Sequence, residues 1–83
     1  MKTIYDKEYR LLVQRLKKTR TDSGFTQSQL AEKLQIDQSY VSKYERCERR
    51  LDVMEIRDIC GALRVDFVDF LSQLDEDLKR KGY

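Results

Sequence analysis

The chain has 83 residues and a net charge of +2; 39% of it is charged and 40% hydrophobic, with three Gly and no Pro or Trp. This length supports one domain with a single small core, and the composition favours an all-α bundle. With no His and only two Cys, the chain lacks the ligands of a tetrahedral zinc site and the usual general base, so we expect no metal site, no cofactor, no catalytic residue and no enzyme activity.

The first predicted helix begins after Asp6 and ends near Asp22, and Gly24 is placed to supply a left-handed exit. Its apolar residues follow the spacing i, i+3, i+4, i+7 and form one inner stripe: Tyr9, Leu12, Val13 and Leu16. Arg20 continues this stripe. A charged side chain on an apolar face requires a partner.

The second predicted helix begins at about Gln27 and is about two turns long. Thr26 and Gln29 have the spacing of a capping box, in which each side chain bonds the backbone N–H of the other residue. Phe25 and Leu30 occupy the positions of a hydrophobic staple. The helix presents one apolar face, which consists of Leu30, Ala31 and Leu34.

The third predicted helix runs from Gln38 to about Arg46, with Asp37 as its N-cap. At about 100° per residue, Val41 and Tyr44 lie on its inner face. The outward face is polar, small and basic: Ser39, Lys43 and Arg46 lie opposite Val41, with Ser42 and Tyr40 on the flanks. Two short helices joined by about three residues are typical of a helix-turn-helix, whose second helix enters the DNA major groove.

The run TQSQLAEKLQIDQSYVSKYERCERRLDVMEI, and more loosely residues 8 to 74, resembles the phage repressor and Cro class of helix-turn-helix domains, called the XRE family. The resemblance implies a five-helix repressor-like bundle that binds a two-fold-related operator as a homodimer and regulates transcription, most simply as a repressor. It also implies an inward ion pair between Arg20 and Glu45. We expect base contacts from Gln38, Ser39, Ser42 and Lys43, and phosphate contacts from Gln27, Tyr40, Arg46, Arg49 and Arg50.

Cys47 and Arg64 stand where the family usually has Gly just after a helix. A residue with a side chain costs about 1 kcal/mol or more in the left-handed region. We therefore expect at least one of these two exits to follow another route.

The fourth predicted helix opens with the capping box Asp52–Glu55, and the fifth opens at Asp66 and runs on toward Gly82. Their expected inner residues are Ile56, Ile59, Cys60 and Leu63, then Phe67, Phe70, Leu71 and Leu74. Three acid-first i, i+4 pairs follow: Asp75 with Lys79, Glu76 with Arg80 and Asp77 with Lys81. Leu78 either packs on the first helix, near Leu11, or joins a dimer contact.

The domain is expected to span residues 1–83, with a core of about 6–74 and a helical extension over 75–83. We expect a soluble, cytoplasmic protein, because the longest uncharged run is too short for a membrane span and two unpatterned Cys fit a reducing compartment. Cys60 is expected in the core. Cys47 is expected to be an exposed loop thiol, whose simplest interpretation is a tolerated substitution rather than a redox group.

Charge is distributed unevenly along the chain: residues 1–20 carry +5 and residues 51–83 carry −3. The basic segment favours a double-stranded DNA partner. The acidic half leaves a second hypothesis open, in which the chain is an antitoxin or another protein-interaction module that uses the same domain to bind DNA and a second surface to bind a protein such as a toxin. An ordinary solvated face is the simpler interpretation of that half.

Overall fold

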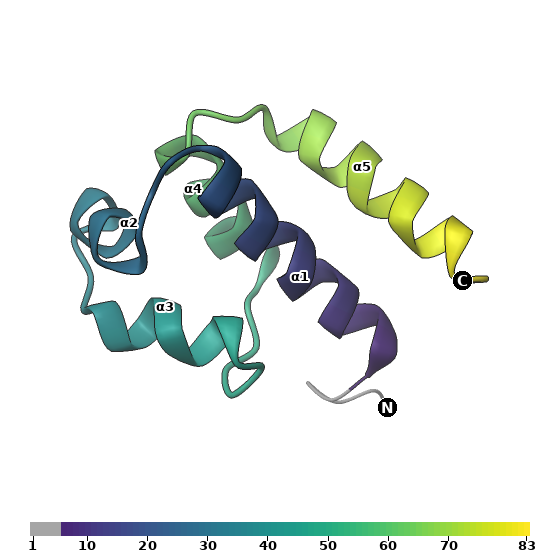
Figure 1. The fold of residues 1–83 in the computed structure, drawn as a ribbon, viewed down its shortest axis with the longest axis horizontal. Coiled ribbons are helices and arrows are strands. Elements are labelled where there is room, and N and C mark those ends of the chain that lie inside the picture. The colour runs from purple at the N-terminus through teal and green to yellow at the C-terminus, as the bar shows by residue number, and fades with distance from the viewer. Residues whose placement is uncertain (1–5) are drawn as a thin grey trace.

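The computed structural model describes residues 6–83, and this part of the chain folds into five helices without a strand (Figure 1). Lys2, counted above in the basic segment, lies outside the described residues. The helices are α1 (Lys7–Asp22), α2 (Gln27–Leu34), α3 (Gln38–Glu45), α4 (Val53–Ala62) and α5 (Phe67–Arg80). The predicted all-α class and the helix-turn-helix of α2 and α3 are therefore confirmed.

Side chains cap three of the helix starts. Thr26 Oγ accepts from the Gln29 N–H at 3.0 Å, and Gln29 Oε1 accepts from the Thr26 N–H at 2.9 Å. Asp52 and Glu55 make the same reciprocal pair at 2.8 and 2.9 Å, and an Asp66 oxygen accepts from the Asp69 N–H. Asp37 is the N-cap residue of α3 but makes no capping bond. Its carboxylate accepts from Ser39 Oγ instead, at 3.2 Å.

All five helices end in the same way. Each exit has a residue of positive φ, and the next N–H donates to the carbonyl five residues back, as in a Schellman motif. The residues of positive φ are Gly24, Gln35, Cys47, Arg64 and Gly82. The expectation that Cys47 or Arg64 takes another route is wrong, because both adopt the left-handed conformation, with φ of 59° and 61°. The carbonyls at a helix end need donors, and this exit supplies two.

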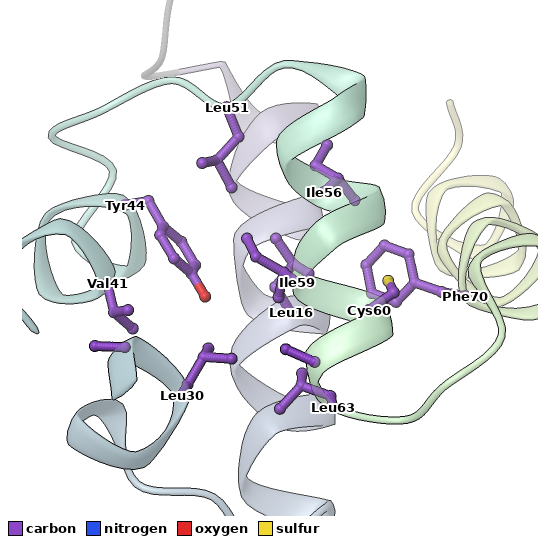
Figure 2. Packing of buried hydrophobic residues seen from close by; sticks show 12 residues of the cluster. Leu16, Leu30, Val41, Tyr44, Leu51, Ile56, Ile59, Cys60, Leu63 and Phe70 are labelled. Carbon is purple, nitrogen blue, oxygen red and sulfur yellow. The ribbon is translucent and has the colours of Figure 1, made fainter. Parts of the chain in front are cut away.

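The core gathers side chains from all five helices (Figure 2). The most deeply buried are Leu16, Leu30, Val41, Tyr44, Ile59 and Cys60. Cys60 was expected in the core, and burial raises the pKa of its thiol to about 11. Leu71 was expected to point inward but is 38% exposed, so α5 buries a narrower face than its sequence indicates.

The second half of α5 runs alongside α1 (Figure 1). Arg15 of α1 clamps Asp77 with two hydrogen bonds, at 2.7 and 2.8 Å. Asp77 also accepts from Arg80 at 2.5 Å, so its expected pairing with Lys81 is wrong. The expected pair between Asp75 and Lys79 is present at 3.1 Å.

Candidate nucleic-acid interface

The α3 helix divides sharply into a buried and an exposed face. Val41 and Tyr44 have no exposed surface and point toward Leu30 and Leu16 (Figure 2). Gln38, Ser39 and Lys43 are exposed, and Ser42 is half-buried. Packing therefore fixes the inner face of α3 and leaves a polar, basic surface free to meet a ligand.

A buried ion pair attaches the end of α3 to α1. Arg20 grips Glu45 through two nitrogens, at 2.7 and 3.0 Å, and the two side chains are only 9% and 2% exposed. The third guanidinium nitrogen donates to the Phe25 carbonyl at 2.8 Å. The bond to Glu45 raises the pKa of Arg20. This arrangement satisfies both charges, which is the condition under which a buried pair is tolerated.

Gln27, the first residue of α2, belongs to the same network. Its amide nitrogen donates to Glu45 at 3.0 Å, and the side chain is half-buried. One hydrogen of that amide stays available for a ligand such as phosphate. The network therefore ties the start of α2, the end of α3 and α1 together.

The first turn of α2 also contacts the first turn of α3. Ser28 Oγ donates to Gln38 Oε1 at 2.8 Å, which restrains the terminal amide of Gln38 while leaving both amide hydrogens free. The hydroxyl of the adjacent Ser39 donates a hydrogen bond to the Asp37 carboxylate. Gln38 thus presents an oriented amide at the exposed end of α3.

At the other end of α3, Arg46 is engaged with its neighbours. It donates to Ser42 Oγ at 2.5 Å and to Glu48 at 2.9 and 3.2 Å. The bond to Arg46 lowers the pKa of the exposed Glu48. Ser42 is an expected base contact and Arg46 an expected phosphate contact. In the free chain these two side chains are hydrogen-bonded to each other.

Arg49 and Arg50, in the loop after α3, each lie over a tyrosine ring. The Arg49 guanidinium lies 4.3 Å from the centroid of Tyr40 and bonds Glu55 at 3.1 Å. The Tyr40 hydroxyl also bonds Glu55. These contacts hold Arg49 and Tyr40 against Glu55, which lies in the first turn of α4.

Arg50 lies 4.7 Å from the centroid of the Tyr9 ring. The Tyr9 hydroxyl accepts from the Leu51 N–H at 2.9 Å and donates to the Arg49 carbonyl at 3.2 Å. Burial raises the pKa of Tyr9. The loop that carries both arginines is thereby attached to α1.

Sequence reasoning missed four residues that support this surface: Tyr9, Ser28, Glu48 and Glu55 in its contacts with Tyr40 and Arg49. Periodicity placed Tyr9 in the core and the capping box identified Glu55, but both have a second role across helices. Cys47 was expected to be exposed and is half-buried. The contacts of Tyr9, Ser28 and Glu55 join residues that are distant in the chain, which no pattern of spacing indicates. Glu48 lies only two residues from Arg46, but this spacing is not diagnostic of a pair.

The described residues contain no group of three or more His, Cys, Asp or Glu side chains that could hold a metal ion. Within the same residues, every helix is too short or too polar to cross a membrane.

A helix-turn-helix family model matches residues 16–70. The chain belongs to the XRE family of helix-turn-helix proteins. An XRE-family like protein from Pseudomonas syringae pv. tomato str. DC3000 is 42% identical, with a TM-score of 0.79, over 83% of this chain and 84% of that one. The restriction-modification controller protein C.Esp1396I is 30% identical, with a TM-score of 0.81, over 88% of this chain and 96% of that one.

C.Esp1396I has also been solved as a tetramer in complex with its natural 35 base-pair operator. The clp gene regulator ClgR from Corynebacterium glutamicum is 25% identical, with a TM-score of 0.75, over 87% of this chain and 77% of that one. No curated protein matches the sequence. The similarity to solved structures thus extends over most of this chain.

Proposed function

We propose that this chain is a sequence-specific transcription repressor that binds a two-fold-related DNA operator as a homodimer. The exposed polar face of α3 carries the proposal, because it lies opposite the buried Val41 and Tyr44 on a helix whose end is fixed by the Arg20–Glu45 pair. A rigid helix with free polar side chains is what reading of base edges in the major groove requires.

In this proposal Gln38 pairs with adenine N6 and N7, and Lys43 donates to guanine O6 and N7. The bond from Ser28 supports this role of Gln38, because it holds the amide before DNA arrives. Ser39 and Ser42 are short and contribute less discrimination. Each good bidentate contact is worth about 1 to 3 kcal/mol against the wrong base.

Phosphate contacts in the proposal come from Gln27 at the start of α2 and from four residues on the flank and exit of α3: Tyr40, Arg46, Arg49 and Arg50. Contacts with aromatic rings hold Arg49 and Arg50 before binding, which lowers the ordering cost. Because cations at phosphates release counterions, affinity for duplex DNA should fall steeply with added salt.

The homodimer surface is proposed on α4 and α5. Apart from Tyr83, the large apolar side chains that are exposed in the described part of the chain are Val53, Met54, Val68 and Leu71. Gly61 lies within α4, and a Cβ there would meet nothing within the chain. A helix-interior Gly costs about 0.5 to 1 kcal/mol, which close approach of a second copy would offset. Leu78 is half-buried and so is a poorer candidate.

Binding-site selection from a random DNA pool tests the proposal. Gln38→Ala should relax the preference at one base position of each half-site, whereas Gln27→Ala should weaken binding to all sequences alike without changing the consensus. Denaturant unfolding of both variants serves as the control, since Gln27 also bonds Glu45. The absence of any enriched sequence with the parent protein, or a consensus altered by Gln27→Ala alone, would contradict the proposal.

Light scattering over a range of concentrations tests the dimer. The parent should approach twice the monomer mass, and Val68→Glu should remain a monomer because it places a charge in an apolar contact. Lys17→Gln, which makes the same change of one charge at an exposed position of α1, is the surface control. A monomer mass for the parent at all concentrations, free and on DNA, would refute the homodimer.

A further inference from the structure

The groove between α1 and the last turns of α5 consists of two adjoining hollows of about 500 and 400 Å³. Leu11, Gln14 and Lys81 line both of them. The Arg15–Asp77 clamp holds the two helices together at this point, with both side chains less than a fifth exposed. The groove is therefore formed by the fold itself.

The lining of this groove is strongly basic. Its six cations are Lys7, Arg10, Arg15, Lys18, Arg80 and Lys81. Asp77 is its one acidic side chain, so the side chains of the lining sum to +5, which exceeds the +2 of all side chains in the sequence and leaves −3 for the others. The lining of the groove is thus net basic, while the other residues taken together are net acidic.

Half of these cations have no counterion among the described residues. Asp77 is shared by Arg15 and Arg80, and Lys18 pairs with Asp22 at 3.0 Å. Within residues 6–83 no carboxylate pairs with the three remaining cations, Lys7, Arg10 and Lys81. Residues 1–5 contain no Asp or Glu that could neutralise them. Crowded like charges raise the free energy of the fold until an anion binds.

The groove lies away from the face of α3. In α1, Lys7, Leu11 and Lys18 fall about 160° to 200° around the helix from Tyr9, which is buried. The ribbon places α3 and α5 on opposite sides of α1 (Figure 1). A duplex bound at α3 would therefore leave these cations unpaired.

The groove also offers apolar contacts. Leu11 is half-buried in its floor, and Tyr83 is 49% exposed at one end. A phosphate chain would use the cations alone, whereas a peptide with alternating acidic and apolar side chains would use both the rim and the floor. We propose that this groove is a docking site for an acidic, partly apolar segment of a partner protein, occupied independently of DNA.

Fluorescence anisotropy with a labelled peptide of alternating Glu and Leu tests the site on the full chain. The parent should bind this peptide with an affinity that falls with salt, and Lys7→Glu/Lys81→Glu should weaken it by about tenfold or more. The matched control is Lys33→Glu/Lys79→Glu, which makes the same charge change on α2 and on the outer side of α5 and should leave binding within about twofold. Equal weakening by both pairs would reduce the effect to net charge and overturn the proposal.

Two further arms identify the ligand class. Tyr83→Ala should weaken binding of the peptide but not of inorganic polyphosphate, because only the peptide uses the apolar contacts. Peptide binding should also persist when the protein is saturated with duplex DNA, and Lys43→Ala should leave it unchanged. Three outcomes would refute a protein-docking site: failure of the parent to bind the peptide, loss of the peptide on addition of DNA, and an equal effect of Tyr83→Ala on peptide and polyphosphate. None of these outcomes bears on the proposed reading of bases by α3.

Discussion

Glu45 and Arg46 are neighbours in the sequence at the end of α3, yet their surroundings are opposite. Glu45 is buried against Arg20, and its side chain is 2% exposed. Arg46 and its partner Glu48 are 56% and 52% exposed. A buried pair cannot lose one partner without leaving a desolvated charge, whereas an exposed pair is replaced by water at little cost. The inner pair therefore holds the fold, and the outer pair leaves Arg46 available to a ligand.

The largest effect should come from breaking the inner pair. Arg20→Ala leaves Glu45 buried without its partner and should lower the free energy of unfolding by about 3 to 5 kcal/mol. Denaturant unfolding measures this as a lower midpoint. Arg46→Ala is the matched control on the exposed pair and should leave the midpoint unchanged. Equal midpoints for Arg20→Ala and the parent would mean that the inner pair contributes little.

The second prediction concerns Tyr44, whose hydroxyl is buried and has no hydrogen-bond partner within the described residues (Figure 2). Tyr44→Phe removes that group and should stabilise the fold by about 1 to 3 kcal/mol. Burial also raises the pKa of Tyr44 above its ordinary value of 10.0. The unfolded tyrosine therefore ionises first, and the parent loses stability as pH rises above 10 while the variant is spared this loss. An advantage of Tyr44→Phe that shrinks above pH 10 would contradict this account.

Cys47, which lies between Arg46 and Glu48 in the chain, offers a smaller effect. Its φ of 59° is left-handed, so Cys47→Gly should stabilise the fold by about 0.5 to 1 kcal/mol by removing the Cβ strain. Gly24→Ala is the opposite control, because it adds a Cβ at a φ of 81° and should destabilise. Thermal unfolding of both variants would show the two signs. A lower Tm for Cys47→Gly would mean that the thiol makes contacts worth more than the strain.

The smallest effect on stability, and the most informative for function, is expected at Glu48. Under the proposed function, Glu48 competes with phosphate for Arg46. Glu48→Gln should therefore bind duplex DNA several-fold more tightly at low salt and steepen the salt dependence by about one released counterion, with an unchanged midpoint of unfolding. Parallel salt titrations of the parent and the variant would measure this. Identical slopes would place Arg46 away from the phosphates.

The helix ends expose one limit of reasoning from sequence. Gly24 was recognised as a left-handed exit because Gly is the residue that adopts this conformation most readily. The same preference predicts no left-handed exit at Cys47, Arg64 or Gln35, whose side chains disfavour it. All of them adopt it, because packing of the flanking helices requires the same exit whatever residue stands there. Local preference of about 1 kcal/mol is overridden when tertiary contacts are worth more.

What the sequence determined by itself is local: five helices, their capping boxes and the buried and exposed faces of α3 all follow from spacings of at most a few residues. The contact between Arg20 and Glu45 came from the family resemblance rather than from spacing. Only the tertiary structure brought Asp77 to Arg15, Ser28 to Gln38 and Tyr9 to the Arg49–Leu51 loop. The physical reason is that helix periodicity sets which way a side chain points, while the packing of helices around Leu16, Tyr44 and Ile59 sets what it meets.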